Sequence, residues 1–414
     1  MKVLLVYPPI FRVVGLASTP LPIGMLQVGQ WLKNEGHQVE ALNLEIGGEI
    51  RTSSIARMRQ AYAETDLPAT LADPRAPWRQ EMRIKIESFR PDILAFSCAT
   101  EQMDAAALLV EDAREILPGI RIELGGSHVE PNDWVRRIGR EALMLDPALD
   151  LLSGQNPPSS FGAVLTSLGC PFDCTFCGSP KRYGRKLVNY PIEQVRSRVM
   201  AAKEAGAPYI HLMDDTVTIQ KQRAIELADL MAEIGLPWRT QTRVDDLCRN
   251  PQLAAYFRDA GCSQLTFGVE SGSPNILKAT RKKITREQVL QAVDILNDAG
   301  VPYTANFMIG FPNETDDDVE QTLDLMDQMR PSRVLAGSVV PYPHTELHDA
   351  FPDFTDAARR WPLCQWSPFD PRFLRDDNGG RIQGPSVAAL NRFFEYIDCI
   401  NNHAPTPGTF STVS

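Results

Sequence analysis

Three cysteines in the middle of the chain have the spacing of ligands to an iron-sulfur cluster. Cys170, Cys174 and Cys177 are separated by three and then two residues, inside the run GCPFDCTFCG at 169–178. Three thiolates can hold three irons of a 4Fe-4S cube and leave the fourth iron with an open position. The glycines and the proline of the run suit a tight loop around such a group. The spacing therefore predicts a redox cluster that binds a small molecule at its open iron.

An open iron beside an electron source suits one particular reaction. The amino and carboxylate groups of S-adenosylmethionine (SAM) can chelate this iron. An electron from the cluster can then enter the sulfonium and release a 5'-deoxyadenosyl radical. The cysteine loop is thus a candidate site of radical formation.

Two other interpretations of the cysteines are weaker. A structural zinc site normally has four ligands in two close pairs, and the sequence shows no second pair. The other cysteines occur singly, which suits core or surface residues, at Cys98, Cys248, Cys262, Cys364 and Cys399. The spacing favours a cluster over zinc and over unrelated core thiols, and we expect no second cluster.

The composition bounds the class of protein. A chain of 414 residues is long for one domain and suits two. Lys and Arg total 42 against 52 Asp and Glu, and the net charge of -10 disfavours a nucleic-acid partner. No apolar run is long enough to cross a bilayer, and residues 1–7 enter a strand-like run without the features of an export signal. We therefore expect a cytoplasmic protein without a membrane partner.

The first part of the chain alternates strands and helices. Strand-like apolar runs occur at 2–7, 37–44, 92–98 and 120–124, and apolar residues have helical spacing at 21–32 and 104–116. Residues 51–90 are expected to be helical, with a loop at 68–77. This alternation predicts a doubly wound (Rossmann-like) parallel sheet. We assign the sheet to residues 1–150, and the domain boundary to the proline-rich stretch at 130–160.

A second alternation follows that boundary. Strands expected at 163–168, 209–213, 238–242, 264–269, 303–309 and 334–340 alternate with helices centred near 197, 227, 254, 290 and 322. Six strands joined by five helices predict a partial (β/α)6 TIM-type barrel at 160–345, with reactive residues at the carboxyl ends of the strands. Residues 346–414 form an extension that is expected to line part of the substrate pocket and to end in a loose tail. The fold class is therefore α/β.

The phrase TSLGCPFDCTFC at 166–177 resembles the radical SAM superfamily, in its branch with an N-terminal cobalamin-binding (B12-binding) domain. The resemblance extends over residues 1–348 and includes further motifs in the family's order. It implies an enzyme that cleaves SAM reductively at a 4Fe-4S cluster and acts on a small-molecule or natural-product substrate. It also implies an external electron donor of the flavodoxin or ferredoxin type.

The resemblance assigns contacts with SAM to residues at the ends of the barrel strands. Carboxylates suit an ammonium or a ribose diol, a guanidinium suits a carboxylate, and apolar side chains suit a purine. The resemblance assigns the contact with the amino group of SAM to Asp214 and Asp215, and a further contact near SAM to Arg243. It assigns the ribose and methionine contacts to Glu270 and Ser271. The adenine motif corresponds to Met308, Ile309 and Gly310, and Phe176 of the cysteine loop is a further cofactor contact. The residue types alone also allow two structural roles in place of SAM contact: a carboxylate could cap a helix, and Arg243 could form a surface ion pair.

The sixth expected strand ends in the run PYPHT at 341–345. The family usually has glycine in place of His344. An ionisable side chain at this position, with Tyr342 beside it, predicts contact with the substrate. A plain turn is the alternative.

The N-terminal part departs from the family's pattern in two respects. It has no Asp-x-His-x-x-Gly segment to supply a histidine ligand to cobalt, and no Gly-Glu-Gly-Glu segment with its preceding strand. Residues 133–150 stand in place of that segment, and the predicted helix could fill the space for the nucleotide tail of cobalamin. A complete and a truncated cobalamin domain therefore both stay open.

Three functions are consistent with these residues. The leading hypothesis is an enzyme that transfers a methyl group to carbon through cobalamin. The alternative enzyme uses no cobalamin and rearranges, cyclises, epimerises or oxidises its substrate. A non-catalytic cluster-binding sensor is the third, and the ordered set of Asp214, Glu270 and Gly310 argues against it.

Overall fold

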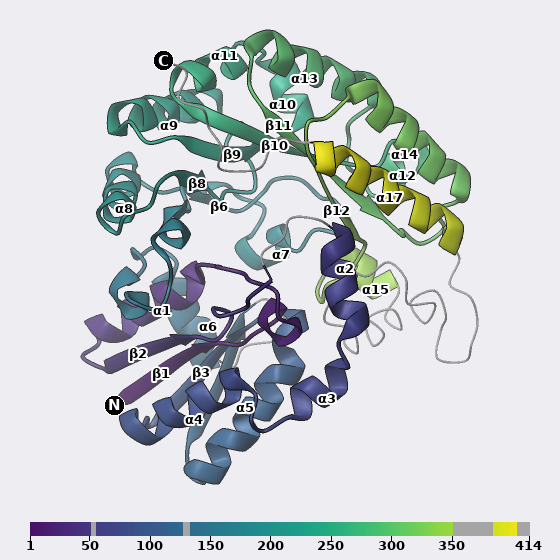
Figure 1. Ribbon diagram of the computed structural model, residues 1–414. Helices are drawn as coiled ribbons and strands as arrows, with labels where there is room; N and C mark the ends of the chain where they lie inside the picture. The colour runs from purple at the N-terminus through teal and green to yellow at the C-terminus, as the bar shows by residue number, and fades with distance from the viewer. Residues whose placement is uncertain (51–54, 127–132, 351–383, 404–414) are drawn as a thin grey trace.

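The N-terminal part of the chain is a four-stranded parallel sheet with helices on both faces, drawn in purple and blue in Figure 1. The structure is a computed structural model that describes residues 1–50, 55–126, 133–350 and 384–403. In the spatial order β2-β1-β3-β4, the strands are β1 (Lys2–Tyr7), β2 (Gln38–Asn43), β3 (Ile93–Cys98) and β4 (Arg121–Gly126). This is the doubly wound sheet that the alternation predicts.

Apolar residues on both faces of the strands explain why helices cover this sheet twice. The helices and helical turns are η1 (Phe11–Val14), α1 (Ile23–Asn34), α2 (Ile55–Glu64), α3 (Leu67–Ala72), α4 (Pro77–Phe89), η2 (Thr100–Gln102), α5 (Met103–Ile116), α6 (Asp133–Ala142), η3 (Leu149–Leu152) and η4 (Pro158–Gly162). In β1, Leu4 and Val6 pack on the side of α4 and α5. Val3 and Leu5 pack on the side of α1, because successive side chains of a strand point to opposite faces.

The helix α3 corrects one prediction. The expected loop at 68–77 is wrong over its first half, which belongs to α3. The carboxylate of Asp66 caps this helix by accepting a hydrogen bond from the N–H of Ala69 at 3.1 Å. Pro68 lies in the first turn, where a helix needs no N–H donor. The proline that indicated a break therefore starts a helix.

The second part of the chain is a six-stranded parallel sheet that forms a partial barrel, drawn in teal and green in Figure 1. In the order β12-β11-β10-β9-β8-β5, its strands are β5 (Ala163–Val164), β8 (Ile210–Leu212), β9 (Trp238–Thr242), β10 (Cys262–Glu270), β11 (Tyr303–Ile309) and β12 (Val334–Ser338). The connecting helices are α8 (Ile192–Glu204), α9 (Lys221–Ile234), α10 (Val244–Arg249), α11 (Gln252–Asp259), α12 (Pro274–Ala279), α13 (Arg286–Ala299) and α14 (Asp316–Met329). The predicted fold class is confirmed.

The first barrel strand is shorter than the sequence predicts. The expected strand at 163–168 is divided into β5, which pairs with β8, and β6 (Ser167–Leu168), which belongs to another sheet. Strand β6 pairs antiparallel with β7 (Val188–Asn189), and helix α7 (Ser179–Tyr183) lies between them. The cysteine loop therefore stands on its own two-stranded base beside the barrel wall.

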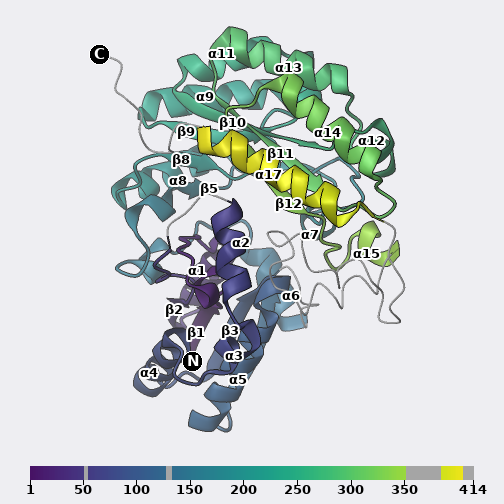
Figure 2. The same ribbon diagram turned by 45° about the vertical axis from the view of Figure 1, so that its right-hand side comes forward.

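The C-terminal helix α17 (Val387–His403), yellow in Figures 1 and 2, runs along the edge of the barrel at β12. The amide of Asn401 donates to the carbonyl of Val334 at 2.9 Å and accepts from its N–H at 3.0 Å, as a neighbouring strand would. Helix α17 also contacts α2 of the N-terminal part. Of the expected extension, the structure describes α17 and α15 (Glu346–Ala350), while 351–383 and the tail at 404–414 lie outside the described residues.

The two parts of the chain meet at the segment that follows α6. The guanidinium of Arg198 in α8 donates to the carbonyl of Leu145 at 3.0 Å and pairs with Asp146 at 2.8 Å. The ring of Tyr190 lies 3.8 Å from the same guanidinium, and its hydroxyl donates to the carbonyl of Leu143. In the part of the chain that the structure describes, no helix is both long and apolar enough to cross a membrane.

Candidate active site

The three predicted cluster ligands lie on the excursion between β6 and β7. Gly169, at its start, has a φ of 88°, and a Cβ there would lie 2.3 Å from the carbonyl oxygen of Lys186. Only glycine fits this left-handed position so close to another backbone segment. The N–H of Cys170 donates to the carbonyl of Gly184 at 3.2 Å and closes the base of the loop.

The three thiols lie in a partly buried place, with Cys170 the most buried of them. The pKa of Cys170 is raised to about 11, mainly by burial and in smaller part by the charges of Asp215 and of the other two thiols. Burial also raises the pKa of Cys177. Among the described residues, no three Cys, His, Asp or Glu side chains are grouped as ligands of one metal ion. The three thiols and Asp215 nevertheless lie close enough for their charges to act on one another.

Asp214 is buried directly below the cysteine loop. Its carboxylate accepts hydrogen bonds from the N–H of Thr166 at 3.1 Å, the hydroxyl of Thr166 at 3.0 Å and the hydroxyl of Ser167 at 2.5 Å. These contacts fix the turn that leads from β5 to β6. Asp215 has a different partner: it accepts a hydrogen bond from the hydroxyl of Ser179 at 2.7 Å, and burial raises its pKa. Of the two carboxylates, Asp215 lies nearer the thiols.

Arg243 joins the end of β9 to the cysteine loop. Its guanidinium pairs with Asp245 at 2.8 Å and donates to the carbonyl of Lys282 at 2.9 Å. It also lies 3.6 Å from the ring centre of Phe172, a cation–π contact with the cysteine loop. The ion pair that the residue types left open is therefore present, and it is buried.

Glu270 ends β10 in a left-handed conformation with a φ of 69°. Its carboxylate forms a buried ion pair with Lys282 at 2.6 Å. The helix that follows is capped by Ser273, whose hydroxyl accepts from the N–H of Ile276, so Glu270 is not needed as a cap. Ser271 is fully buried, and its hydroxyl contacts that of Thr322 at 3.1 Å.

The predicted adenine motif contributes to an apolar patch beside the cysteine loop. Met308 and Phe176 pack on one cluster of buried side chains, in which the rings of Phe176 and Phe311 meet edge to face at 6.0 Å. Ile309 points to the opposite side and belongs to the barrel core. Gly310 has a φ of 88°, and its N–H donates to Glu314 at 2.6 Å. The structure thus brings Phe176 and Met308 together, and separates Ile309 from them.

The two predicted substrate residues have different surroundings. The hydroxyl of Tyr342 donates to Glu101 of η2 at 3.1 Å, which links the barrel to the N-terminal part. His344 is exposed and has a φ of 70°, the conformation that favours glycine. The turn at His344 therefore keeps the backbone that the family's glycine would adopt.

Sequence reasoning missed the residues that hold these groups in place. They are Thr166 and Ser167, which bind Asp214, and the loop at 280–283, which touches Arg243, Glu270 and the cysteine loop. Their residue types are common in any loop. The signal that could have found them is the run of three consecutive cations at 281–283 in an acidic chain.

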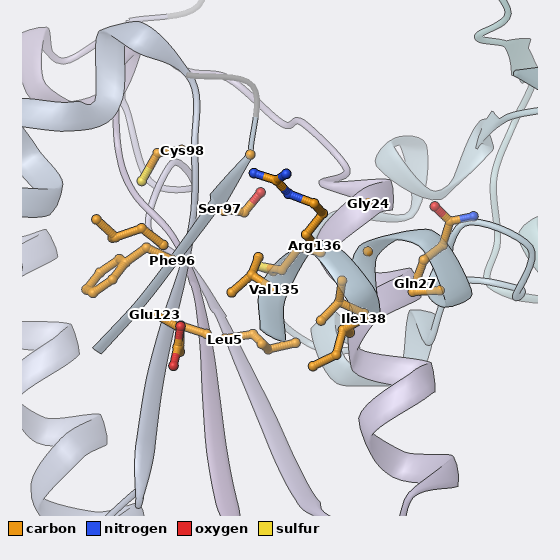
Figure 3. A pocket seen from close by; sticks show the side chains of 18 of the residues that line it. Leu5, Gly24, Gln27, Phe96, Ser97, Cys98, Glu123, Val135, Arg136 and Ile138 are labelled. Atoms are coloured by element: carbon orange, nitrogen blue, oxygen red, sulfur yellow. The ribbon is translucent and has the colours of Figure 1, made fainter. Parts of the chain in front are cut away.

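A cavity of about 520 Å³ opens at the carboxyl edge of the N-terminal sheet. It lies between the ends of the strands and the helices α1 and α6, and its lining is mostly apolar. Figure 3 shows side chains of the strands, of α1 and of α6 around it, among them Leu5, Gln27, Phe96, Ser97, Val135, Arg136 and Ile138. Helix α6 forms one wall of this cavity. The expectation that residues 133–150 fill the space for the nucleotide tail of cobalamin stays a prediction.

The same cavity reaches the cluster-bearing excursion. Arg182 and Tyr183 of α7, which starts two residues after Cys177, belong to its lining. Gly24 and Gly139 also line it, and a Cβ at either position would meet no atom within 4 Å. The glycines therefore leave room in the cavity, and the cavity extends from the sheet edge to α7.

A model of the radical SAM superfamily matches residues 164–326, from β5 into α14. This stretch contains the three thiols and the predicted SAM contacts from Asp214 to Gly310. The chain belongs to the radical SAM superfamily. The 4Fe-4S cluster and SAM are the cofactors of this family, and the prediction of an enzyme is confirmed.

Relatives of this radical SAM enzyme extend the likeness beyond the matched domain. An uncharacterised methyltransferase of Pyrococcus horikoshii is 27% identical over 84% of the chain and 82% of the relative. An anaerobic magnesium-protoporphyrin IX monomethyl ester cyclase of Rubrivivax gelatinosus is 28% identical over 66% of the chain and 60% of the cyclase. The chain thus spans less than two thirds of the cyclase.

The radical SAM methyltransferase TsrM of Kitasatospora setae, solved with cobalamin and a 4Fe-4S cluster, has a similar fold. The TM-score is 0.64 at 14% sequence identity, over 98% of this chain and 93% of TsrM. At this identity the likeness shows the fold alone. Both parts of the present radical SAM enzyme are therefore found together in one known architecture.

Proposed function

We propose that this radical SAM enzyme methylates a carbon atom of a small-molecule or natural-product substrate, with cobalamin held in the N-terminal cavity. The observation that carries the proposal is that one cavity is shared by the sheet edge and by α7 of the cluster-bearing excursion. In doubly wound sheets, ligands bind at the carboxyl edge of the strands. A cofactor in this cavity would lie against α7, which starts two residues after Cys177.

The lining of the cavity fits an extended, largely apolar ligand. Its volume of about 520 Å³ lies in the range of cofactor and drug sites. Gly24 and Gly139 leave space on two helices, and Arg136 and Gln27 add polar groups. The strand that normally precedes the family's Gly-Glu-Gly-Glu segment is not seen in the described residues, where the N-terminal sheet has four strands and no fifth.

We assign the following roles to residues of the chain. Once bound, the cluster and cobalamin would supply an electron for SAM cleavage and a carrier for the methyl group. Cys170, Cys174 and Cys177 would hold the cluster. We propose Asp215, Arg243, Glu270 and the patch of Phe176 and Met308 as the SAM contacts. The contacts of these residues with or beside the cysteine loop support this assignment. Asp214 would keep the loop in place. Tyr342 and His344 stay proposals for substrate contact.

The reaction needs an electron from outside the chain. We propose an external donor of the flavodoxin or ferredoxin type, and we place the enzyme in the cytoplasm.

The test of cobalamin binding uses anaerobically reconstituted enzyme, titrated with hydroxocobalamin and then desalted. We expect a stoichiometric corrin spectrum to survive. Gly24→Leu and Gly139→Leu should lose it, because both side chains would enter the cavity. Gly119→Leu is the matched control, since it also meets no neighbouring atom but lies outside the cavity. Wild-type enzyme without retained corrin would refute the proposal.

The four-stranded sheet favours one second candidate. If no corrin is retained, the N-terminal part would only shape the site, and the adenosyl radical would abstract hydrogen for rearrangement, cyclisation, epimerisation or oxidation. Formation of 5'-deoxyadenosine without a methylated product would identify this outcome.

A further inference from the structure

The loop at 280–283, between α12 and α13, contacts both the cysteine loop and the predicted SAM residues. We propose that Lys282 of this loop is a positioning residue for SAM binding: its ammonium holds the carboxylate of Glu270, and its carbonyl holds Arg243. The inference rests on the proposed function in one respect, since it takes Glu270 and Arg243 as contacts of SAM.

The backbone of this loop is unusual. Arg281 and Lys283 have φ values of 53° and 59°, although neither is glycine. Such conformations cost free energy and persist only when surrounding contacts impose them. The contacts here are with the cysteine loop: the N–H of Thr175 donates to the carbonyl of Thr280 at 3.1 Å, and Lys283 pairs with Asp173 at 2.7 Å. The loop is therefore shaped by docking on the segment that carries the cluster ligands.

The strained backbone places Lys282 inside the barrel end. Its side chain and that of Glu270 are each about 10% exposed and lie 2.6 Å apart. A Cβ on Gly268 would lie 2.1 Å from the Glu270 oxygen and 2.7 Å from the Lys282 nitrogen. The pair thus crosses directly over Gly268, and any side chain there would displace it. The position of the Glu270 carboxylate therefore depends on Lys282 and on the absence of a side chain at Gly268, as well as on the rotamer of Glu270.

The carbonyl of Lys282 fixes the second predicted contact. It accepts from the guanidinium of Arg243 at 2.9 Å, and the same guanidinium lies over the ring of Phe172. One residue therefore joins the ends of β9 and β10 to the cysteine loop. For a ligand that bridges the cluster and these strand ends, the carboxylate of Glu270 and the guanidinium of Arg243 would already be oriented before the ligand binds.

A purely structural ion pair is the competing explanation. Buried ion pairs add little net stability, whereas removal of one partner leaves an unpaired charge. The positioning role differs because it predicts a loss of SAM affinity that depends on Glu270. A double-mutant cycle between the two residues separates the explanations.

The experiment uses the full chain, reconstituted anaerobically, with SAM affinity from equilibrium dialysis, iron content, and the change of the cluster's EPR signal on SAM addition. Lys282→Met should keep its iron and bind SAM about tenfold or more weakly, and Lys282→Arg should restore most of the affinity and the EPR change. The double variant with Glu270→Gln should bind SAM no more weakly than Glu270→Gln alone. The double variant leaves no unpaired buried charge. Its SAM affinity therefore still tests the inference if Lys282→Met alone folds poorly. Lys278→Met, exposed and four residues earlier, is the control and should bind SAM normally.

The outcomes separate this inference from the proposed function. Normal SAM affinity in Lys282→Met, with Glu270→Gln impaired, would overturn the positioning role alone. Normal affinity in both would show that Glu270 does not bind SAM, and the assigned SAM contacts would fail with it. Loss of iron in Lys282→Met would make Lys282 part of the support of the cluster and would also overturn the inference.

Discussion

Replacing Asp214 by alanine tests whether this carboxylate binds SAM or holds the cysteine loop. The side chain is 1% exposed and accepts from three groups, the N–H and hydroxyl of Thr166 and the hydroxyl of Ser167. Alanine would leave these three donors buried without an acceptor. At about 1 to 3 kcal/mol for each unsatisfied group, the three groups together cost on the order of 3 to 9 kcal/mol.

Part of this loss is offset. Burial raises the pKa of Asp214, so the wild-type protein carries a desolvation cost that alanine removes. We therefore expect a net loss of about 2 to 4 kcal/mol, which lowers the melting temperature by roughly 5 to 15 °C in a domain of this size. Asp214→Asn keeps an acceptor and no charge, and should cost about 1 kcal/mol or less.

The assay is thermal unfolding of the cluster-free protein, followed by anaerobic reconstitution and an iron count. Asp214→Ala should melt early and take up less iron. Asp215→Asn is the control for stability, because its carboxylate accepts from the hydroxyl of Ser179 and not from Thr166 or Ser167. An alanine variant with unchanged melting and iron content but impaired SAM binding would refute this reasoning and restore the amino-group contact that the family resemblance implies.

Three further predictions concern the cluster and the fold around it. Alanine at each of the three cluster cysteines should abolish the iron-sulfur absorption of reconstituted protein, and bound zinc without iron would contradict the assignment. Gly169→Ala should reduce cluster uptake, because its Cβ would lie 2.3 Å from the carbonyl of Lys186, whereas Gly178→Ala, which meets no atom within 4 Å, should take up iron normally. Burial raises the pKa of Glu314 to about 8, so the folded state holds a proton that the unfolded state has released, and the free energy of unfolding should fall between about pH 4.5 and 8. Denaturant titrations across that range should show this fall in the wild type, and Glu314→Gln, which keeps an acceptor for Gly310, should flatten it.

The sequence predicts the layers of this molecule well because its strands and helices have distinct apolar periods. Strand β1 is buried on both faces and reads as a continuous apolar run, and the helices on each side of it read as amphipathic. The errors arise where local chemistry decides. Residues 163–168 look like one strand, but Asp214, distant in sequence, binds the backbone N–H of Thr166 and diverts the chain toward β6.

The sequence predicts those parts of the site in which the type and spacing of the residues indicate the chemistry. Three thiols with this spacing indicate a cluster without further information. By contrast, Lys282 enters the site through a backbone conformation that no residue type in the segment signals. Ile309 is the opposite case: the family motif includes it, whereas strand alternation turns its side chain into the core, so its contact with SAM stays a prediction.

The helix α17 has a consequence for how this chain is synthesised. Its Asn401 completes the hydrogen bonds of Val334 at the edge of β12, and the helix packs on both α14 and α2. Domains tend to form from the N-terminus as the ribosome extends the chain. The barrel edge would therefore stay open until the last residues of α17 emerge. During that interval an unpaired strand is a template for pairing with another nascent chain, so we expect slow translation or early termination before α17 to cause aggregation.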